Sequence, residues 1–180
     1  METIKTFVEN FLKAETTASD ASVKPNLEDY NQKLEIMNSF CVPELYNKFG
    51  MIPHTSLKSD DFYERWKNNP PVKPRHIYKI SHYQDKIYNN VYVVYLSEKN
   101  PDEEIFQYSM SLFLATLNDE LKIIKSYSFG YDDKKIKEKF EAPMGLSDIS
   151  FKTLKKPIAI ERYQKPEDDD DAMAHYEMDI

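Results

Sequence analysis

The spacing of apolar side chains changes near residue 75, and this change constrains the fold more than any other feature of the sequence. Before it, apolar residues recur every three or four positions, as they do along one side of an α-helix. From Arg75 onward they recur at every second position, which is typical of one face of a β-strand. The sequence therefore predicts helices followed by a sheet, an α+β fold.

The N-terminal part is predicted to form two amphipathic helices. The first should end near Glu15, because the following stretch is small, polar and closed by a proline. Asn26 is a suitable N-cap for the second, whose apolar stripe continues to Cys41. Pro43 suits the first turn of a further helical segment, and residues 61–66 have the capping-box spacing of one more short helix.

Four segments rich in β-forming residues follow, with short polar connections between them: 75–83, 87–98, 104–117 and 121–131. Such short connections predict antiparallel hairpins, because a parallel crossover needs a dozen residues or more. The third segment alternates apolar and polar residues, so one face of the sheet is expected in the core and the other in solvent. Because this segment is longer than a typical strand, a bend or bulge is expected along it. Residues 158–163 are predicted to add one more strand.

Length and composition favour one domain in a reducing compartment. The 180 residues divide into a domain at 1–163 and an acidic tail at 164–180. The single cysteine, Cys41, lies in an apolar run and is interpreted as a buried thiol. No stretch of the sequence has the pattern of a signal peptide or a membrane span, so the cytoplasm is the expected location and no membrane partner is predicted.

Charge and glycine content argue against several functional classes. A net charge of −7 disfavours general binding to nucleic acid, which requires a basic surface. Only 3 glycines are present, so neither a P-loop nor a dinucleotide-binding loop is predicted. No histidine spacing is typical of a zinc site, and the sequence predicts no metal and no cofactor.

The order of the predicted elements resembles that of the NTF2-like superfamily. The likeness is carried by the segment PELY at 43–46, by the segment DFYERW at 61–66 and by the long hairpins that follow Pro74. The resemblance implies a cone in which the N-terminal helices pack on a strongly curved antiparallel sheet. Members of this superfamily include enzymes, transport adaptors and immunity proteins that neutralise bacterial toxins. An acidic chain with one cysteine and no catalytic spacing is most similar to the immunity group.

Two histidines on the first predicted strand are the candidates for chemistry. His76 and His82 share a strand parity with Tyr78, so a pocket on that side would hold imidazoles suited to acid–base work. The alternative interpretation is that both are surface histidines. At the usual rise they would lie roughly 20 Å apart, too far to share a metal ion or a proton.

The candidate binding residues are strand tyrosines and the acidic run of the tail: Tyr92, Tyr95, Tyr108, Glu167, Asp168, Asp169, Asp170 and Asp171. Tyrosine offers a large contact area at a low entropy cost, although packing within the sheet is the alternative interpretation. The acidic run would either meet a basic partner, such as a toxin domain, or fold back on the lysines between Lys134 and Lys156.

These patterns predict a non-catalytic protein that binds a protein partner, with neutralisation of a bacterial toxin as the leading hypothesis. The alternative is a small-molecule-binding protein or enzyme that uses the pocket of the cone, with His76, Tyr78 and His82 as polar groups. A homodimer formed through the sheet is also compatible with the sequence.

Overall fold

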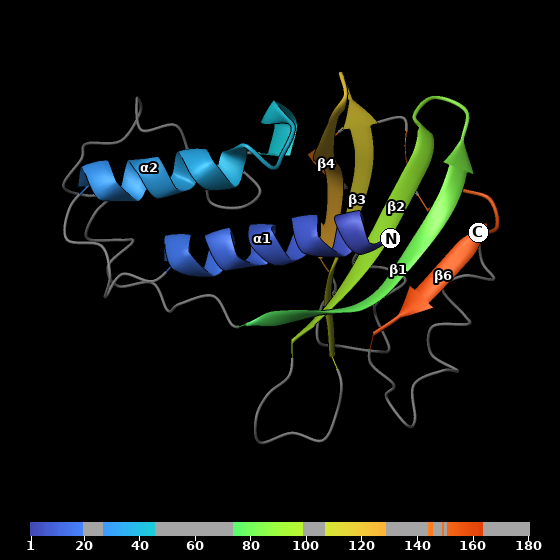
Figure 1. The fold of residues 1–180 in the computed structure, drawn as a ribbon, viewed down its shortest axis with the longest axis horizontal. Helices are drawn as coiled ribbons and strands as arrows, with labels where there is room; N and C mark the ends of the chain where they lie inside the picture. The colour runs from blue at the N-terminus through green and yellow to red at the C-terminus, as the bar shows by residue number, and fades with distance from the viewer. Residues whose placement is uncertain are drawn as a thin grey trace.

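The fold is mixed α+β, with two helices followed by an antiparallel sheet (Figure 1). A computed structural model describes residues 1–19, 27–45, 74–98, 107–128, 144–145, 149 and 151–163. Its helices are α1 (Glu2–Ser19), α2 (Leu27–Asn38) and the 3₁₀ helix η2 (Pro43–Leu45). Its strands are β1 (Arg75–Asp85), β2 (Asn89–Glu98), β3 (Gln107–Leu117), β4 (Glu120–Ser128), β5 (Met144–Gly145) and β6 (Ala159–Arg162).

The four predicted hairpin strands are confirmed as β1 to β4, which pair antiparallel in chain order. The strand predicted at 158–163 is β6, and the sheet has the order β5-β4-β3-β2-β1-β6. The expected end of the first helix at Glu15 is wrong, because α1 continues to Ser19. The predicted helix at 61–66 lies outside the described residues, as does most of the segment after Pro43.

Short turns set the register of the hairpins. Asn118 and Asp119 join β3 to β4 with φ angles of 50° and 63°, so both central residues of this two-residue turn are left-handed. Asn and Asp tolerate this conformation, which matches the twist of the flanking strands. In the β1–β2 turn, Asp85 Oδ2 accepts hydrogen bonds from the amides of Ile87 and Tyr88 at 2.8 and 2.9 Å.

Bulges interrupt three of the strand pairs, and one of them changes which face a residue occupies. Ile77 pairs with Leu96, but Lys79 pairs with Tyr95, so Tyr78 is an extra residue in β1. Ser109 is an extra residue in β3, because Leu96 of β2 pairs with Met110 and Ser97 pairs with Tyr108. The bulge expected along the third predicted strand is therefore confirmed.

Both faces of the sheet are buried at its centre, which corrects the expectation of one solvent-exposed face. Every residue from Met110 to Ala115 is buried, whichever face it occupies. The second face is covered by the segment that follows β5, in which Ile149 and Leu154 are 1% and 2% exposed. The alternation of polar residues in β3 did not indicate this cover, because it comes from a segment distant in the sequence.

Helix α1 lies across the strands in Figure 1 and contributes to the same core. Ile4, Val8 and Phe11 belong to one buried apolar cluster with the side chains of β1 to β4. The buried carboxylate of Glu15 receives two hydrogen bonds of 2.8 Å from Arg75 Nη1, so the C-terminal half of α1 is joined to the first residue of β1.

Candidate functional site

The two candidate histidines do not share a face of the sheet. His76 pairs with Ser97 and His82 pairs with Tyr92. Ser97 and Tyr92 are five positions apart on β2, so they lie on opposite faces, and directly paired residues lie on the same face. The expected shared parity is wrong because Tyr78 is an extra residue between the two histidines.

His82 lies at the surface in a hydrogen-bonded position, whereas the Tyr78 ring is packed in the interior. His82 is half-buried, stacks on the Tyr92 ring with centroids 4.5 Å apart, and its Nε2 lies 2.8 Å from Asn90 Oδ1. Tyr78 is fully buried, and its hydroxyl accepts a hydrogen bond of 3.0 Å from Arg162 Nη1. His76 is exposed. The three candidate pocket residues therefore do not converge on one point.

The candidate partner-binding tyrosines differ in their accessibility. Tyr92 is half-buried, and Tyr95 is 3% exposed, which removes Tyr95 from a partner surface. The Tyr95 ring contacts the Lys79 ammonium, which lies 4.3 Å from the ring centroid, and it stacks on Phe151 with 6.3 Å between the ring centroids. Tyr108 is placed in β3, and the acidic run at 167–171 lies outside the described residues.

Phe151 fills the space above the centre of the second sheet face. Its ring centroid lies 4.8 Å from that of Phe113 and 4.9 Å from that of Tyr127. Ser111 pairs with Tyr95 on one side and with Tyr127 on the other, so the Phe151 ring lies over Ser111. Burial raises the pKa of Tyr127 to about 12, so this phenol stays protonated at neutral pH.

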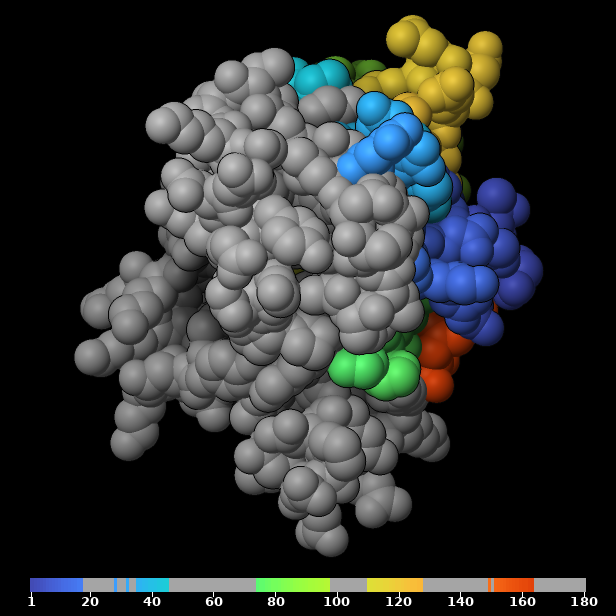
Figure 2. Space-filling view, turned by 90° about the vertical axis from the view of Figure 1, so that its left-hand side faces the viewer, coloured from blue at the N-terminus to red at the C-terminus, as the bar shows by residue number. Residues whose placement is uncertain are grey.

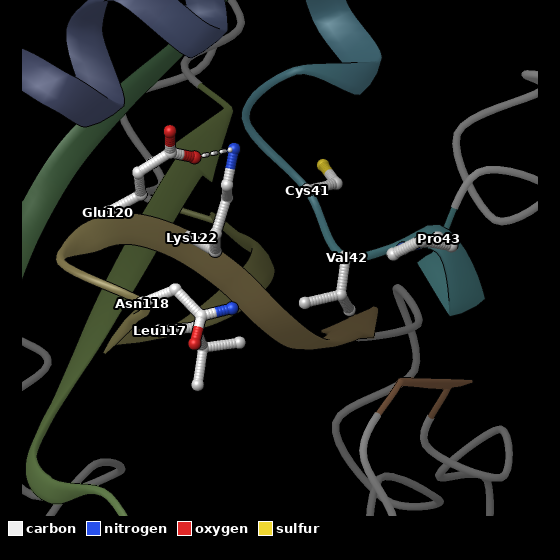
Figure 3. A pocket seen from close by; sticks show the side chains of 7 residues that line it. All are labelled: Cys41, Val42, Pro43, Leu117, Asn118, Glu120 and Lys122. Atoms are coloured by element: carbon white, nitrogen blue, oxygen red, sulfur yellow. Dashed lines mark ion pairs between the residues drawn. The ribbon is translucent and has the colours of Figure 1, made fainter.

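A hollow of about 400 Å³ opens beside the β3–β4 turn, as Figure 3 shows. Its lining side chains come from the segment that follows α2 and from the β3–β4 hairpin: Cys41, Val42, Pro43, Leu117, Asn118, Glu120 and Lys122. Burial, followed by the charge of Glu15, raises the pKa of the Cys41 thiol to about 12. A thiol with this pKa is not a nucleophile at neutral pH, because almost none of it is thiolate. Cys41 is thus the buried thiol that the sequence indicates.

A strand with an exposed isoleucine forms one end of the sheet. Figure 1 shows β6 outside β1, and no described strand pairs with its outer edge. Ile160 of β6 is 42% exposed, and Ile158, just before the strand, is 58% exposed. These are two of the four large apolar side chains that are exposed among the described residues; the others are Ile36 and Ile87.

β6 is held firmly although its side chains are exposed. All four of its residues pair with residues of β1, from Lys79 to His82. On either side of this ladder, the Ile158 amide donates to the His82 carbonyl at 2.8 Å, and the Tyr163 amide donates to the Tyr78 carbonyl at 2.9 Å. Figure 2 shows this segment reaching the surface beside α1, where the Lys5 ammonium lies 5.0 Å from the Tyr163 ring centroid.

The sequence predicted this strand but did not indicate that it is a binding candidate. Its edge position depends on the order of strands in the sheet, which follows from tertiary pairing. The available signal was the pair of isoleucines at alternate positions after Pro157, in a segment otherwise rich in lysine.

The remaining tests for a site give no further candidate. Among the described residues, no group of three or more histidine, cysteine or acidic side chains is placed to hold a metal ion. The described helices include none that is long and apolar enough to span a membrane. No protein-family model, curated protein or solved structure matches the chain.

Proposed function

We propose that the chain is a non-catalytic protein-binding protein that takes an extended segment of its partner along the outer edge of β6. The observation that carries this proposal is the exposure of Ile160, 42%, on the edge strand β6, and of Ile158, 58%, just before it. We propose this edge in place of the sheet tyrosines, of which Tyr95 is buried.

The proposal follows from the chemistry of an edge strand. Alternate backbone amides and carbonyls of such a strand point away from its sheet, and they can pair with an extended peptide. Ile158 and Ile160 would add apolar contact to this backbone pairing. Because each is about half exposed, its burial would contribute on the order of 1 kcal/mol.

Protection from aggregation alone does not account for the exposed isoleucine of β6. Natural proteins protect edge strands with proline or with charged side chains. β6 has charged side chains at its last two positions, Glu161 and Arg162, but it also has isoleucine at its second position, and this side chain is exposed. An exposed apolar residue on a rigidly paired edge favours a surface that is covered by a partner.

The specific role that we propose is stoichiometric neutralisation of a bacterial toxin. This role rests on the net charge of −7 and on the element order that resembles NTF2-like immunity proteins. The curved cone implied by that resemblance is part of the same proposal. Because fold alone does not determine function, the binding edge is tested separately from the role.

Where the genome encodes a toxin-like protein beside this chain, the direct experiment measures binding of the purified chain to that protein by calorimetry. The Ile160→Asp variant should weaken binding at least tenfold, because it places a charge in the proposed contact. The matched control is Ile36→Asp on α2, since Ile36 is 57% exposed and lies on another element. Equal affinities for the wild type and Ile160→Asp would reject the edge, and no complex at micromolar concentration would count against the toxin partner. Sedimentation of the chain alone tests whether a second copy occupies the edge instead.

A further inference from the structure

The surface around β6 has the opposite charge to the protein as a whole. The segment 151–163 contains four basic residues and one acidic residue, a net charge of +3, whereas the whole chain has −7. The basic side chains are Lys152, Lys155, Lys156 and Arg162, and all four are exposed. The single acid, Glu161, is half-buried.

The basic residues flank the exposed isoleucines on both sides. Lys155 and Lys156 precede Ile158, and Arg162 follows Ile160. Ile160 pairs with Ser81 and Arg162 pairs with Lys79, two positions away on β1, so Ile160 and Arg162 lie on the same face of the sheet. A strand added beside β6 would therefore meet apolar side chains at its centre and positive charge at both ends.

We infer that the partner segment is an acidic β-strand, with apolar side chains at alternate central positions and carboxylates at both ends. This inference rests on the proposed function and specifies the chemistry of the partner at the same edge. Each apolar residue would pack against Ile158 or Ile160, and the carboxylates would approach Lys155, Lys156 and Arg162. The chain thus recognises its partner through an acidic segment of that partner, whatever the charge of the rest of the partner's surface.

The guanidinium of Arg162 is held at the sheet by a contact with Tyr78. Its Nη1 donates to the Tyr78 hydroxyl at 3.0 Å, and its carbon lies 6.0 Å from the Tyr78 ring centroid. Tyr78 is fully buried, so this contact anchors the Arg162 side chain to the sheet. A guanidinium has five N–H donors in a planar fork, which suits it to a carboxylate.

The test uses disulfide-closed β-hairpin peptides. Their outer strand is already extended, so the peptide loses little conformational entropy when it binds. In the acidic hairpin, two valines at alternate positions are flanked by glutamates; in the basic hairpin, lysines replace the glutamates. Each is titrated into the ¹⁵N-labelled full chain, and the amide shifts of Ala159–Arg162 are followed. The acidic hairpin should bind at least tenfold more tightly than the basic one, and its advantage should shrink as salt is raised.

Charge-reversal variants provide the matched control. In the Lys155→Glu/Lys156→Glu variant the preference for the acidic hairpin should be lost. The Lys13→Glu/Lys86→Glu variant has the same change of charge at exposed positions on α1 and in the β1–β2 turn, and it should keep the preference. Equal shifts of the β6 amides with both hairpins would overturn the inference that the partner segment is acidic, but would still support β6 as the binding edge. Absence of shifts in β6 with either hairpin would overturn the edge itself.

Discussion

Replacing Phe151 with alanine tests how the second face of the sheet is covered. The Phe151 ring contacts three aromatic rings, those of Tyr95, Phe113 and Tyr127, at centroid distances of 6.3, 4.8 and 4.9 Å. Removal of the ring leaves a cavity above Ser111, which the neighbouring side chains cannot fill without moving from their paired strands.

The expected cost is about 3 kcal/mol in the free energy of unfolding. Phenylalanine-to-alanine changes in a core cost roughly 3–5 kcal/mol, and the lower end applies because Phe151 is only partly buried. The aromatic contacts are included in this range, because pairwise values of roughly 0.5–1.5 kcal/mol are not additive. For a chain of 180 residues, such a loss corresponds to a decrease in Tm of about 6–12 °C.

The assay is urea unfolding followed by circular dichroism, with the midpoint and slope compared between variants. The control is Lys152→Ala, because Lys152 is the next residue and is exposed. It should change the free energy of unfolding by less than about 0.5 kcal/mol. If Phe151→Ala were as stable as this control, Phe151 would not be part of the core, and the reasoning that both sheet faces are buried would be refuted.

Three further predictions concern buried polar groups. Ser111→Ala should leave the free energy of unfolding unchanged or raise it by up to about 1 kcal/mol in the same assay. The reason is that Ser111 Oγ is buried and has no hydrogen-bond partner in the described part of the chain. A decrease of more than about 1 kcal/mol would mean that the hydroxyl is hydrogen-bonded. Arg75→Ala should lower the free energy of unfolding by about 2 kcal/mol, because it leaves the buried Glu15 carboxylate without its 2.8 Å ion pair. Glu15→Gln should lower it by less, because it removes the buried charge itself. A larger loss for Glu15→Gln than for Arg75→Ala would contradict this account. The pKa of Cys41 rises on folding from 9.0 to about 12, so the folded state holds a proton that the unfolded state loses above pH 9. The stability of the wild type should therefore fall between about pH 9 and 12 more steeply than that of Cys41→Ala, and parallel pH profiles would contradict the burial of the thiol.

The sequence was most informative where local chemistry determines the structure. Alternating apolar residues located β1 to β4 and β6. The polar connection at 118–120 marked a turn, in which Asn118 and Asp119 are the two left-handed residues. The apolar run around Cys41 also indicated its burial correctly. Each of these signals lies within a few residues of the feature that it specifies.

Features that depend on distant contacts could not be predicted. The extra residue Tyr78 in β1 reverses the parity that His76 was expected to share with His82. Nothing in the alternation of β3 indicated that Phe151 would cover Ser111 from 40 positions away. The edge position of β6 likewise follows from the pairing of Ile160 with Ser81, and the exposure of Ile160 follows from that position.

Amide hydrogen exchange of the full chain, with and without its partner, tests the proposed binding edge most directly. An added strand would pair with the outward backbone amides of β6, so the alternate amides of Ala159–Arg162 that do not donate to β1 should exchange at least tenfold more slowly in the complex. Ile36 lies on α2, and its neighbours there should exchange at an unchanged rate. Protection that appears elsewhere, with β6 exchanging as fast as in the free chain, would contradict the account.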